Sequence, residues 1–357
     1  MASQEAAPRA YIGSFTTAQG PGITVARIDD RTGPGALTTP RTAVVDTALV
    51  NPSYLAFSPT RDVLYAVSET GEGAVAAFSL AADPDRPEPL GAPVPVRGDG
   101  PTHLALAADG RRLFTANYGS GSVSALPLDD SAGAPGAPTT VLPHHGNGPV
   151  PDRQSAPHAH AVVPDPSGRW LLAVDLGTDS VWISALDATT GDPVPHHETA
   201  LRPGTGPRTL VFHPRGHRAY VLNELDPTLT VCRWDAASGT LEPLGETRVV
   251  PPGTDGPPVH PSTPVISPDG RFLWTANRGD DTLSVLALDA DGDRPELRAT
   301  VDCGGHWPRH LTAHGGVLYA ANERSGDVTW FTVEPGTGIP RRAGAIAVPA
   351  ASCVVFA

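Results

Sequence analysis

The stretch that decides the fold is PRTLVFHPRGHRAYVLNELDPTLTVCRWD, residues 207–235. It predicts three short strands, TLVFH, RAYVLNE and TLTVCRWD, which are separated by a Pro-Arg-Gly turn and a polar turn. Related units open at Pro52, Pro101, Pro261 and Pro308, and another contains His158. A strand-rich unit that recurs about every 50 residues is typical of a β-propeller, in which each unit forms one blade.

The two ends of the chain complete one another. Residues 10–15 and 23–29 match the second and third strands of the unit, but no first strand precedes them. Residues 349–356, PAASCVVF, match a first strand. We therefore expect an all-β, seven-bladed β-propeller over residues 10–357, whose ring is closed by N- and C-terminal strands that share one blade, after a disordered tail over residues 1–9. Closing the ring hides strand edges that an open sheet would expose.

Composition excludes several classes of function. The formal net charge is −13, whereas a nucleic-acid-binding protein needs a basic face. The three cysteines are odd in number and lie far apart in apolar strands, which favours small core residues over disulfides or metal ligands. No secretory signal or run of 18 apolar residues is visible. We expect a cytoplasmic monomer that binds neither nucleic acid nor membranes.

Equivalent positions of the repeat place polar side chains on one rim. We call the residue after the proline that opens each unit, or its equivalent His160, the opening position. The end position is the last residue of the second strand, after the Asn, Asp or Ser. Antiparallel neighbours bring these two positions to the same rim. The opening positions are Ser53, Thr102, His160, Arg208, Ser262 and Arg309, and the end positions are Phe15, Glu69, Tyr118, Leu176, Glu224, Arg278 and Glu323. We expect the charged members and His160 to face one central cavity.

Other interpretations of these residues remain open. The arginines are alternatively structural, forming ion pairs between blades with Glu69, Glu224 and Glu323. His158 and His160 alternate and would share a face, which would supply half of a metal site, but no third ligand has suitable spacing. We therefore expect no metal and no cofactor. Further histidines are assigned to loops and expected to be solvated: His144, His145, His196 and His197.

The remaining motifs narrow the chemistry. The chain has no G-x-S-x-G elbow and no plausible nucleophilic cysteine, which disfavours an acyl-enzyme mechanism. No helix is convincingly signalled. Two Gly/Pro-rich insertions, residues 129–157 and 249–260, each precede a first strand. In a propeller such loops lie on one face, where they are candidate walls of a site.

Five strings resemble the lactonase family of seven-bladed propellers: RQSAPHAH (153–160), GPRTLVFHP (206–214), NE (223–224), ANRG (276–279) and WPRHL (307–311). That family includes the bacterial propeller-type 6-phosphogluconolactonases and the fungal 3-carboxy-cis,cis-muconate lactonizing enzyme. The resemblance covers residues 11–356 and implies catalytic roles for His160, Arg208, Glu224 and Arg278. The chain departs from the family pattern at Thr209, where a histidine is common, and in the loop over residues 142–151.

These residues and the resemblance together predict metal-independent hydrolysis of an anionic sugar-acid lactone, a hydrolase activity of carbohydrate metabolism in the pentose phosphate pathway. His160 and Glu224 are both candidates for the acid/base, and the arginines would hold the anion and the developing oxyanion. We assign substrate binding to Arg309, Glu323, His158, Arg153, Gln154, Glu69, Tyr118 and His103.

Three alternatives to lactone hydrolysis stay open. The first is a lactonizing cyclase or cycloisomerase of an unsaturated carboxylate, which would use the same groups in swapped roles. The second is a non-catalytic binding platform, because the fold alone does not determine function. The third is a metal-dependent lactonase or oxidoreductase propeller.

Overall fold

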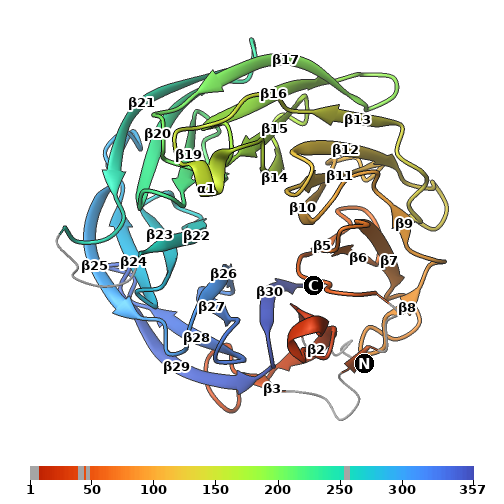
Figure 1. Cartoon of the computed structure of the whole chain (residues 1–357). Coiled ribbons are helices and arrows are strands. Elements are labelled where there is room, and N and C mark those ends of the chain that lie inside the picture. Colours follow the sequence, from red (N-terminus) through yellow and green to blue (C-terminus); the bar gives the residue numbers. More distant parts are fainter. Residues whose placement is uncertain (1–7, 39–43, 46–48, 253–257) are drawn as a thin grey trace.

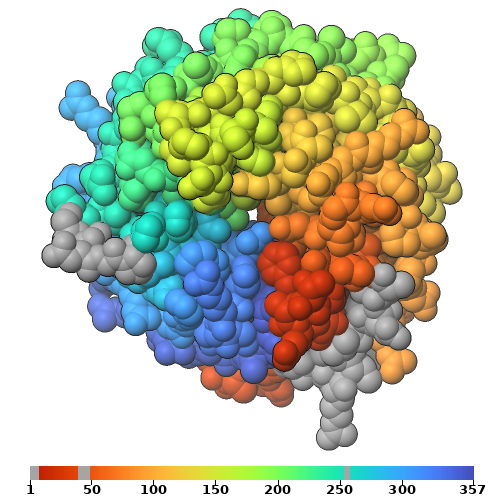
Figure 2. Space-filling view, in the orientation of Figure 1, coloured from red at the N-terminus to blue at the C-terminus, as the bar shows by residue number. Residues whose placement is uncertain are grey.

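The computed structural model describes residues 8–38, 44–45, 49–252 and 258–357. Within these residues the strands form seven antiparallel sheets, arranged as blades around a central axis (Figure 1). The predicted all-β, seven-bladed propeller is confirmed. In the space-filling view the blades meet around a narrow central depression (Figure 2).

The closing blade joins the two ends of the chain, as predicted. Its strand order is β3-β2-β1-β30, with β4 also paired to β2. The C-terminal strand β30 pairs antiparallel with β1, placing Ala10 opposite Phe356 and Ile12 opposite Val354. The strands of this blade are β30 (Ala351–Phe356), β1 (Arg9–Ser14), β2 (Ile23–Ile28), β3 (Leu37–Thr38) and β4 (Val44–Val45).

The other six blades each come from one continuous part of the chain, numbered here in chain order with their strands named from the centre outward. Blade 1 contains β5 (Leu55–Phe57), β6 (Val63–Ser68), β7 (Ala74–Ser79), β8 (Glu88–Pro89) and β9 (Val94–Pro95). Blade 2 contains β10 (Pro101–Leu106), β11 (Arg112–Asn117), β12 (Ser122–Pro127) and β13 (Thr140–Pro143). Blade 3 contains β14 (Ala159–Pro164), β15 (Trp170–Asp175), β16 (Ser180–Leu186) and β17 (Pro193–Ala200).

Blades 4 to 6 follow the same plan. Blade 4 contains β18 (Pro207–Phe212), β19 (Arg218–Asn223), β20 (Thr228–Asp235) and β21 (Thr240–Arg248). Blade 5 contains β22 (His260–Ile266), β23 (Phe272–Arg278), β24 (Thr282–Ala287) and β25 (Glu296–Asp302). Blade 6 contains β26 (Pro308–His314), β27 (Val317–Asn322), β28 (Asp327–Val333) and β29 (Pro340–Ala347).

The hydrophobic core is divided among the interfaces between blades. The described residues form seven buried apolar clusters, each built from two neighbouring blades. Between blades 3 and 4, for example, Trp170 and Leu172 pack with Val221 and Trp234. Each sheet therefore buries both faces, which explains why its inner strands are rich in apolar residues. The charged residues of the candidate site lie near the ends of these strands.

A buried polar residue at the end of the second strand ties that strand to the third. In blade 4, Asn223 donates from Nδ2 to the hydroxyls of Thr228 and Thr230, at 2.9 and 3.0 Å. Asn117, Asn277 and Asn322 make equivalent bonds in blades 2, 5 and 6. These bonds fix the backbone directly before each end position, so they also fix where the end-position side chain begins.

Two helical turns were not predicted from the sequence: the 3-10 turn η1 (Thr16–Ala18) and the helix α1 (Pro151–Gln154). Proline suits the first position of a helix, and α1 begins with Pro151. The helix lies beside the central depression on the face seen in Figures 1 and 2. The first predicted insertion also contains β13, the outer strand of blade 2, so only its second part is a rim loop.

Arg9, expected to belong to the disordered tail, is the first residue of β1, where its Nε lies 2.7 Å from Asp85 Oδ1. Residues 1–7 of the expected tail lie outside the described residues. Of the second insertion, residues 253–257 also lie outside the described part. Among the described residues, no helix has the length and apolar character needed to cross a membrane.

Candidate active site

Except for Ser53, which precedes β5, the opening positions lie in β-bulges of the innermost strands. In blade 4, Pro207 pairs with Asn223 and Thr209 with Leu222, so Arg208 has no residue opposite it. The same register shift isolates Thr102, His160, Arg309 and Ser352, and in blade 5 both Ser262 and Thr263. A bulge re-aims its side chain away from the normal alternation of a strand. Ser352, the opening position of the closing blade, was missed in the sequence comparison.

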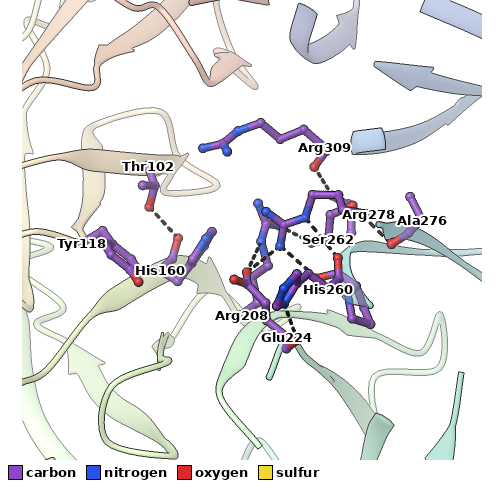
Figure 3. Close-up of polar contacts among 12 residues, drawn as sticks. Thr102, Tyr118, His160, Arg208, Glu224, His260, Ser262, Ala276, Arg278 and Arg309 are labelled. Atoms are coloured by element: carbon purple, nitrogen blue, oxygen red, sulfur yellow. Dashed lines mark hydrogen bonds and ion pairs between the residues drawn. The ribbon is translucent and has the colours of Figure 1, made fainter. Parts of the chain in front are cut away.

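Small polar residues at the opening positions connect neighbouring blades. Thr102 donates its hydroxyl to the carbonyl oxygen of His160 at 3.0 Å. Ser352 donates to the carbonyl oxygen of Ser53 at 2.9 Å, which helps to close the ring. Such bonds satisfy backbone oxygens that the bulge removes from the sheet ladder. The larger opening residues, His160, Arg208 and Arg309, are drawn with their side chains directed toward the pore (Figure 3).

Three arginines surround the carboxylate of Glu224. Arg278 Nη2 lies 2.6 Å from Oε2, and Arg153 Nη2 lies 2.7 Å from Oε1. Arg208 Nε lies 3.1 Å from Oε2, but in an orientation that makes an ion pair without a hydrogen bond, so this buried N–H lacks an acceptor among the described residues. Arg208 Nη1 also donates to the Ser262 carbonyl oxygen. We call these four residues the arginine side of the pore: Arg153, Arg208, Glu224 and Arg278. Figure 3 labels Arg208, Glu224 and Arg278.

The arginine side keeps Glu224 ionised. The side chain of Glu224 is only 5% exposed. Burial alone would raise the pKa of its carboxyl, but Arg278 and Arg208 outweigh burial and hold the pKa well below its ordinary value. Arg153 and Arg278 already engage both oxygens of Glu224, so its geometry favours a part in positioning the arginines.

His160 has a different environment. It is 8% exposed, and among the described residues neither ring nitrogen has a hydrogen-bond partner. Its ring meets Tyr118 edge-on, with centroids 5.6 Å apart. Burial, reinforced by the nearby Arg208, lowers the pKa of the imidazole well below its ordinary value. The imidazole is therefore neutral near pH 7, with a nitrogen lone pair available to accept a proton.

A second ion-pair cluster lies across the pore. Arg309 of blade 6 lies 3.4 Å from both Glu69 of blade 1 and Glu323 of blade 6, and its guanidinium lies 4.8 Å from the centre of the Phe15 ring. Ser53 donates its hydroxyl to Glu69. We call Glu69, Arg309 and Glu323 the carboxylate side of the pore. The ion pairs of the structural alternative are therefore present, and of the residues expected to share one cavity His160, Arg208 and Arg309 line one together.

Four other residues assigned to substrate binding lie around the arginine side, with different exposure. Tyr118 stacks on His158 with centroids 4.4 Å apart, and His158 donates from Nδ1 to the Tyr118 carbonyl oxygen. Arg153 projects from α1 to Glu224. Gln154 is fully buried: its Nε2 donates to the Leu176 carbonyl oxygen, and its Oε1 accepts from the Val150 N–H. This arrangement gives Gln154 a structural part, anchoring the helix that carries Arg153.

A second layer of the pore was largely missed by the sequence analysis. His103 and His310 follow the opening positions of blades 2 and 6, and both rings pack against Tyr54. Burial is the main cause that lowers the pKa of each imidazole to about 3. With His160, Arg208 and Arg309 they line a cavity of about 30 Å³, room for one or two water molecules. Only His103 was predicted, and repeat alignment one residue further would have found His310, Tyr54, Thr209 and Thr263.

The expectation that four histidines lie in solvated loops is wrong for His144, which is buried, and for His196 and His197, which lie in a strand. His144 is buried, stacks on Trp182 and lies with Nδ1 2.7 Å from Asp175 Oδ2. Asp175 replaces the usual asparagine of the repeat, and this pair ties the rim loop to blade 3. His196 and His197 are exposed, as expected, but belong to strand β17. No three metal-binding side chains are grouped within the described residues, so nothing there extends the His158–His160 pair into a metal site.

Comparison with known proteins supports the seven-bladed fold. The family model described as "Lactonase, 7-bladed beta-propeller" matches residues 9–356. The 6-phosphogluconolactonase of Bacillus subtilis is 29% identical over 355 residues, with 97% of each chain covered. A periplasmic gluconolactonase of Pseudomonas aeruginosa has a TM-score of 0.90 at 29% identity, covering 98% of this chain and 99% of that one. A protein from Lactobacillus plantarum has a TM-score of 0.90 at 27% identity, covering 99% and 100%.

Proposed function

This chain belongs to the lactonase family of seven-bladed β-propellers, and we propose that it hydrolyses a sugar-acid lactone that carries a negative charge. The first candidate substrate is 6-phosphoglucono-lactone, the substrate implied by the name of the Bacillus subtilis relative. One observation carries the proposal: three arginines and an unpartnered, neutral histidine converge on one pore. This combination can hold an anion and accept a proton in the same place.

The arginine side supplies binding energy for the anion and the transition state. Arg153, Arg208 and Arg278 exceed Glu224 in charge by two, so the anion does not have to displace the carboxylate to find positive charge. Guanidinium groups form strong, directed hydrogen bonds with phosphate and carboxylate. The buried Nε of Arg208, which has no acceptor, would complete its hydrogen bonding on an oxygen of the substrate.

His160 is the group best placed to act as the base. In the proposed reaction, neutral His160 takes a proton from water as that water attacks the lactone carbonyl carbon. The carbonyl oxygen becomes an oxyanion, which Arg208 and Arg278 stabilise. The ring C–O bond then breaks, and the protonated His160 returns its proton to the departing ring oxygen. The product is the open-chain hydroxy acid, and the cavity beneath His160 offers a place for the attacking water.

Glu224 is assigned to positioning, because three guanidinium groups already engage its oxygens. We also propose that the reaction needs no metal ion, since general base catalysis and arginines supply both the nucleophile and the oxyanion stabilisation. Removal of metals with EDTA is expected to leave turnover unchanged. Loss of turnover that zinc or calcium restores would contradict this part of the proposal.

The test is the hydrolysis of 6-phosphoglucono-lactone by the protein and by His160→Gln. Because a positioned acid/base contributes roughly 10²- to 10⁴-fold, kcat should fall by that factor with little change in KM. The matched control is His196→Gln, an exposed histidine on β17, which should keep full activity. Full turnover by His160→Gln would remove His160 as the base and transfer the role to Glu224. Failure of the unmodified protein to hydrolyse any anionic lactone would overturn the proposed function.

A further inference from the structure

The two sides of the pore have opposite net charge. The arginine side has three guanidinium groups and one carboxylate, a net charge of +2. The carboxylate side has two carboxylates and one guanidinium, a net charge of −1. Nothing in lactone hydrolysis itself requires a negative surface beside an anion-binding surface. A feature of the substrate would explain why the two sides of the pore differ in net charge.

The two sides also occupy different parts of the ring. The arginine side draws on blades 4 and 5 and on α1, whereas the carboxylate side spans from blade 6 to blade 1 across the closing blade. They meet at the centre, where Arg309 of the carboxylate side and Arg208 of the arginine side line one cavity with His160. A ligand next to His160 would therefore experience both sides at once.

The carboxylates of Glu69 and Glu323 retain capacity for further hydrogen bonds. Their side chains are 20% and 24% exposed, against 5% for Glu224. Both contacts with Arg309 are long, at 3.4 Å, and an ionised carboxylate has about four acceptor sites. Glu224 instead accepts shorter bonds, 2.7 Å on Oε1 and 2.6 Å on Oε2, and its deeper burial leaves less access for a further donor. Hydroxyl groups are the natural donors for such exposed acceptors in a site that also binds an anion.

We propose that Glu69 and Glu323 recognise the hydroxyl groups of a polyhydroxylated lactone and reject substrates with a second anionic group on that side. This inference rests on the proposed function and defines the substrate class. Arg309, the partner of both glutamates, lines one cavity with His160 and Arg208, and the buried Arg208 Nε lacks an acceptor among the described residues, which independently indicates that a ligand completes the site.

The chemistry of a sugar δ-lactone matches this division. Its ring oxygen joins the carbonyl carbon C1 to C5, and C5 carries C6 with the phosphate. The carbonyl and the phosphate therefore flank one edge of the ring, and the hydroxyls on C2, C3 and C4 occupy the other. With the first edge on the arginine side, next to His160, the hydroxyl edge meets Glu69 and Glu323. A tricarboxylate such as 3-carboxy-cis,cis-muconate would place negative charge against these carboxylates, which is unfavourable.

The experiment compares two lactones on one enzyme preparation: 6-phosphoglucono-δ-lactone and its 2,3,4-trideoxy analogue. The ratio of their kcat/KM values does not depend on the fraction of correctly folded enzyme. In Glu69→Gln/Glu323→Gln this ratio should fall by about tenfold or more, because hydrogen bonds from hydroxyls to charged acceptors are lost. The control is Glu242→Gln/Glu296→Gln, two exposed surface carboxylates, which should leave the ratio unchanged.

A second measurement on the same double variant should change in the opposite direction. The affinity for 3-carboxy-cis,cis-muconate, measured by titration calorimetry, should rise by about tenfold in the same double variant, because like charges are removed. An unchanged ratio and an unchanged affinity would overturn the recognition of hydroxyls and leave lactone hydrolysis standing. If the unmodified protein hydrolyses neither lactone, the proposed function falls. Tighter binding of the tricarboxylate than of 6-phosphogluconate by that protein would then overturn this inference as well.

Discussion

Blade 4 and the closing blade have the same backbone plan but different chemistry at the pore. Both have a bulge on the innermost strand, occupied by Arg208 in blade 4 and by Ser352 in the closing blade. The end position holds Glu224 in blade 4 and Phe15 in the closing blade. Arg208 and Glu224 form a buried ion pair, whereas Ser352 binds the backbone of Ser53. The repeat therefore sets the backbone position from which each side chain projects into the pore. The type of residue at that position determines whether the blade contributes to the candidate site or to closing the ring.

The largest effect should come from removing the inner strand of the closing blade. A chain ending at Pro349 lacks β30, whose residues Ala351, Cys353 and Val354 are completely buried. It also leaves β1 without its inner partner. Loss of this apolar contact and of the ladder should lower Tm by about 10 °C or more. Thermal unfolding followed by circular dichroism measures this change in Tm. The control is Ser352→Ala, which loses one hydrogen bond and should lower Tm much less. Melting within a degree or two of the intact protein would show that the closing blade does not hold the ring.

In blade 4 the expected change is smaller and electrostatic. Glu224→Gln leaves three buried or half-buried guanidinium groups without their shared carboxylate, and should lower the free energy of unfolding by about 3–5 kcal/mol. Denaturant unfolding measures this loss. The control is Glu242→Gln on the outer strand of the same blade, where a half-exposed ion pair with Arg233 contributes less than about 1 kcal/mol. If the two variants lowered the free energy of unfolding equally, the ion pairs of the pore would contribute no more to stability than the ion pair on the outer strand.

The loss of stability in Glu224→Gln should depend on pH. The folded-state pKa of Glu224 lies below its unfolded value, which is near 4.3. Its stabilising contribution is therefore fully present above the unfolded pKa and is lost as pH falls through the folded pKa. The stability difference between the protein and Glu224→Gln should be constant above about pH 5 and shrink below pH 4. A difference that persists unchanged at low pH would show that the variant acts through packing instead of charge.

The ring and its rim were predictable because they follow from repetition. Aligning six repeats was enough to bring His160, Arg208, Glu224 and Arg278 together without any contact information. The bulges were not predictable, since a bulge inserts one residue without disturbing the apolar pattern on either side of it. Helix α1 was missed because four residues give no helical period. The burial of His144 depends on Trp182 and Asp175, which lie more than 30 positions away in the sequence.

The most direct test of the account is a crystal structure of the protein with bound 6-phosphogluconate, the expected product. The central claim is that the bulge and end positions of blades 3 to 5 form the anion site. The account predicts a phosphate or carboxylate oxygen within about 3.2 Å of both Arg208 and Arg278, with C1 of the product next to His160. A product bound outside the pore, with Arg208 and Arg278 still engaged only with Glu224, would contradict it.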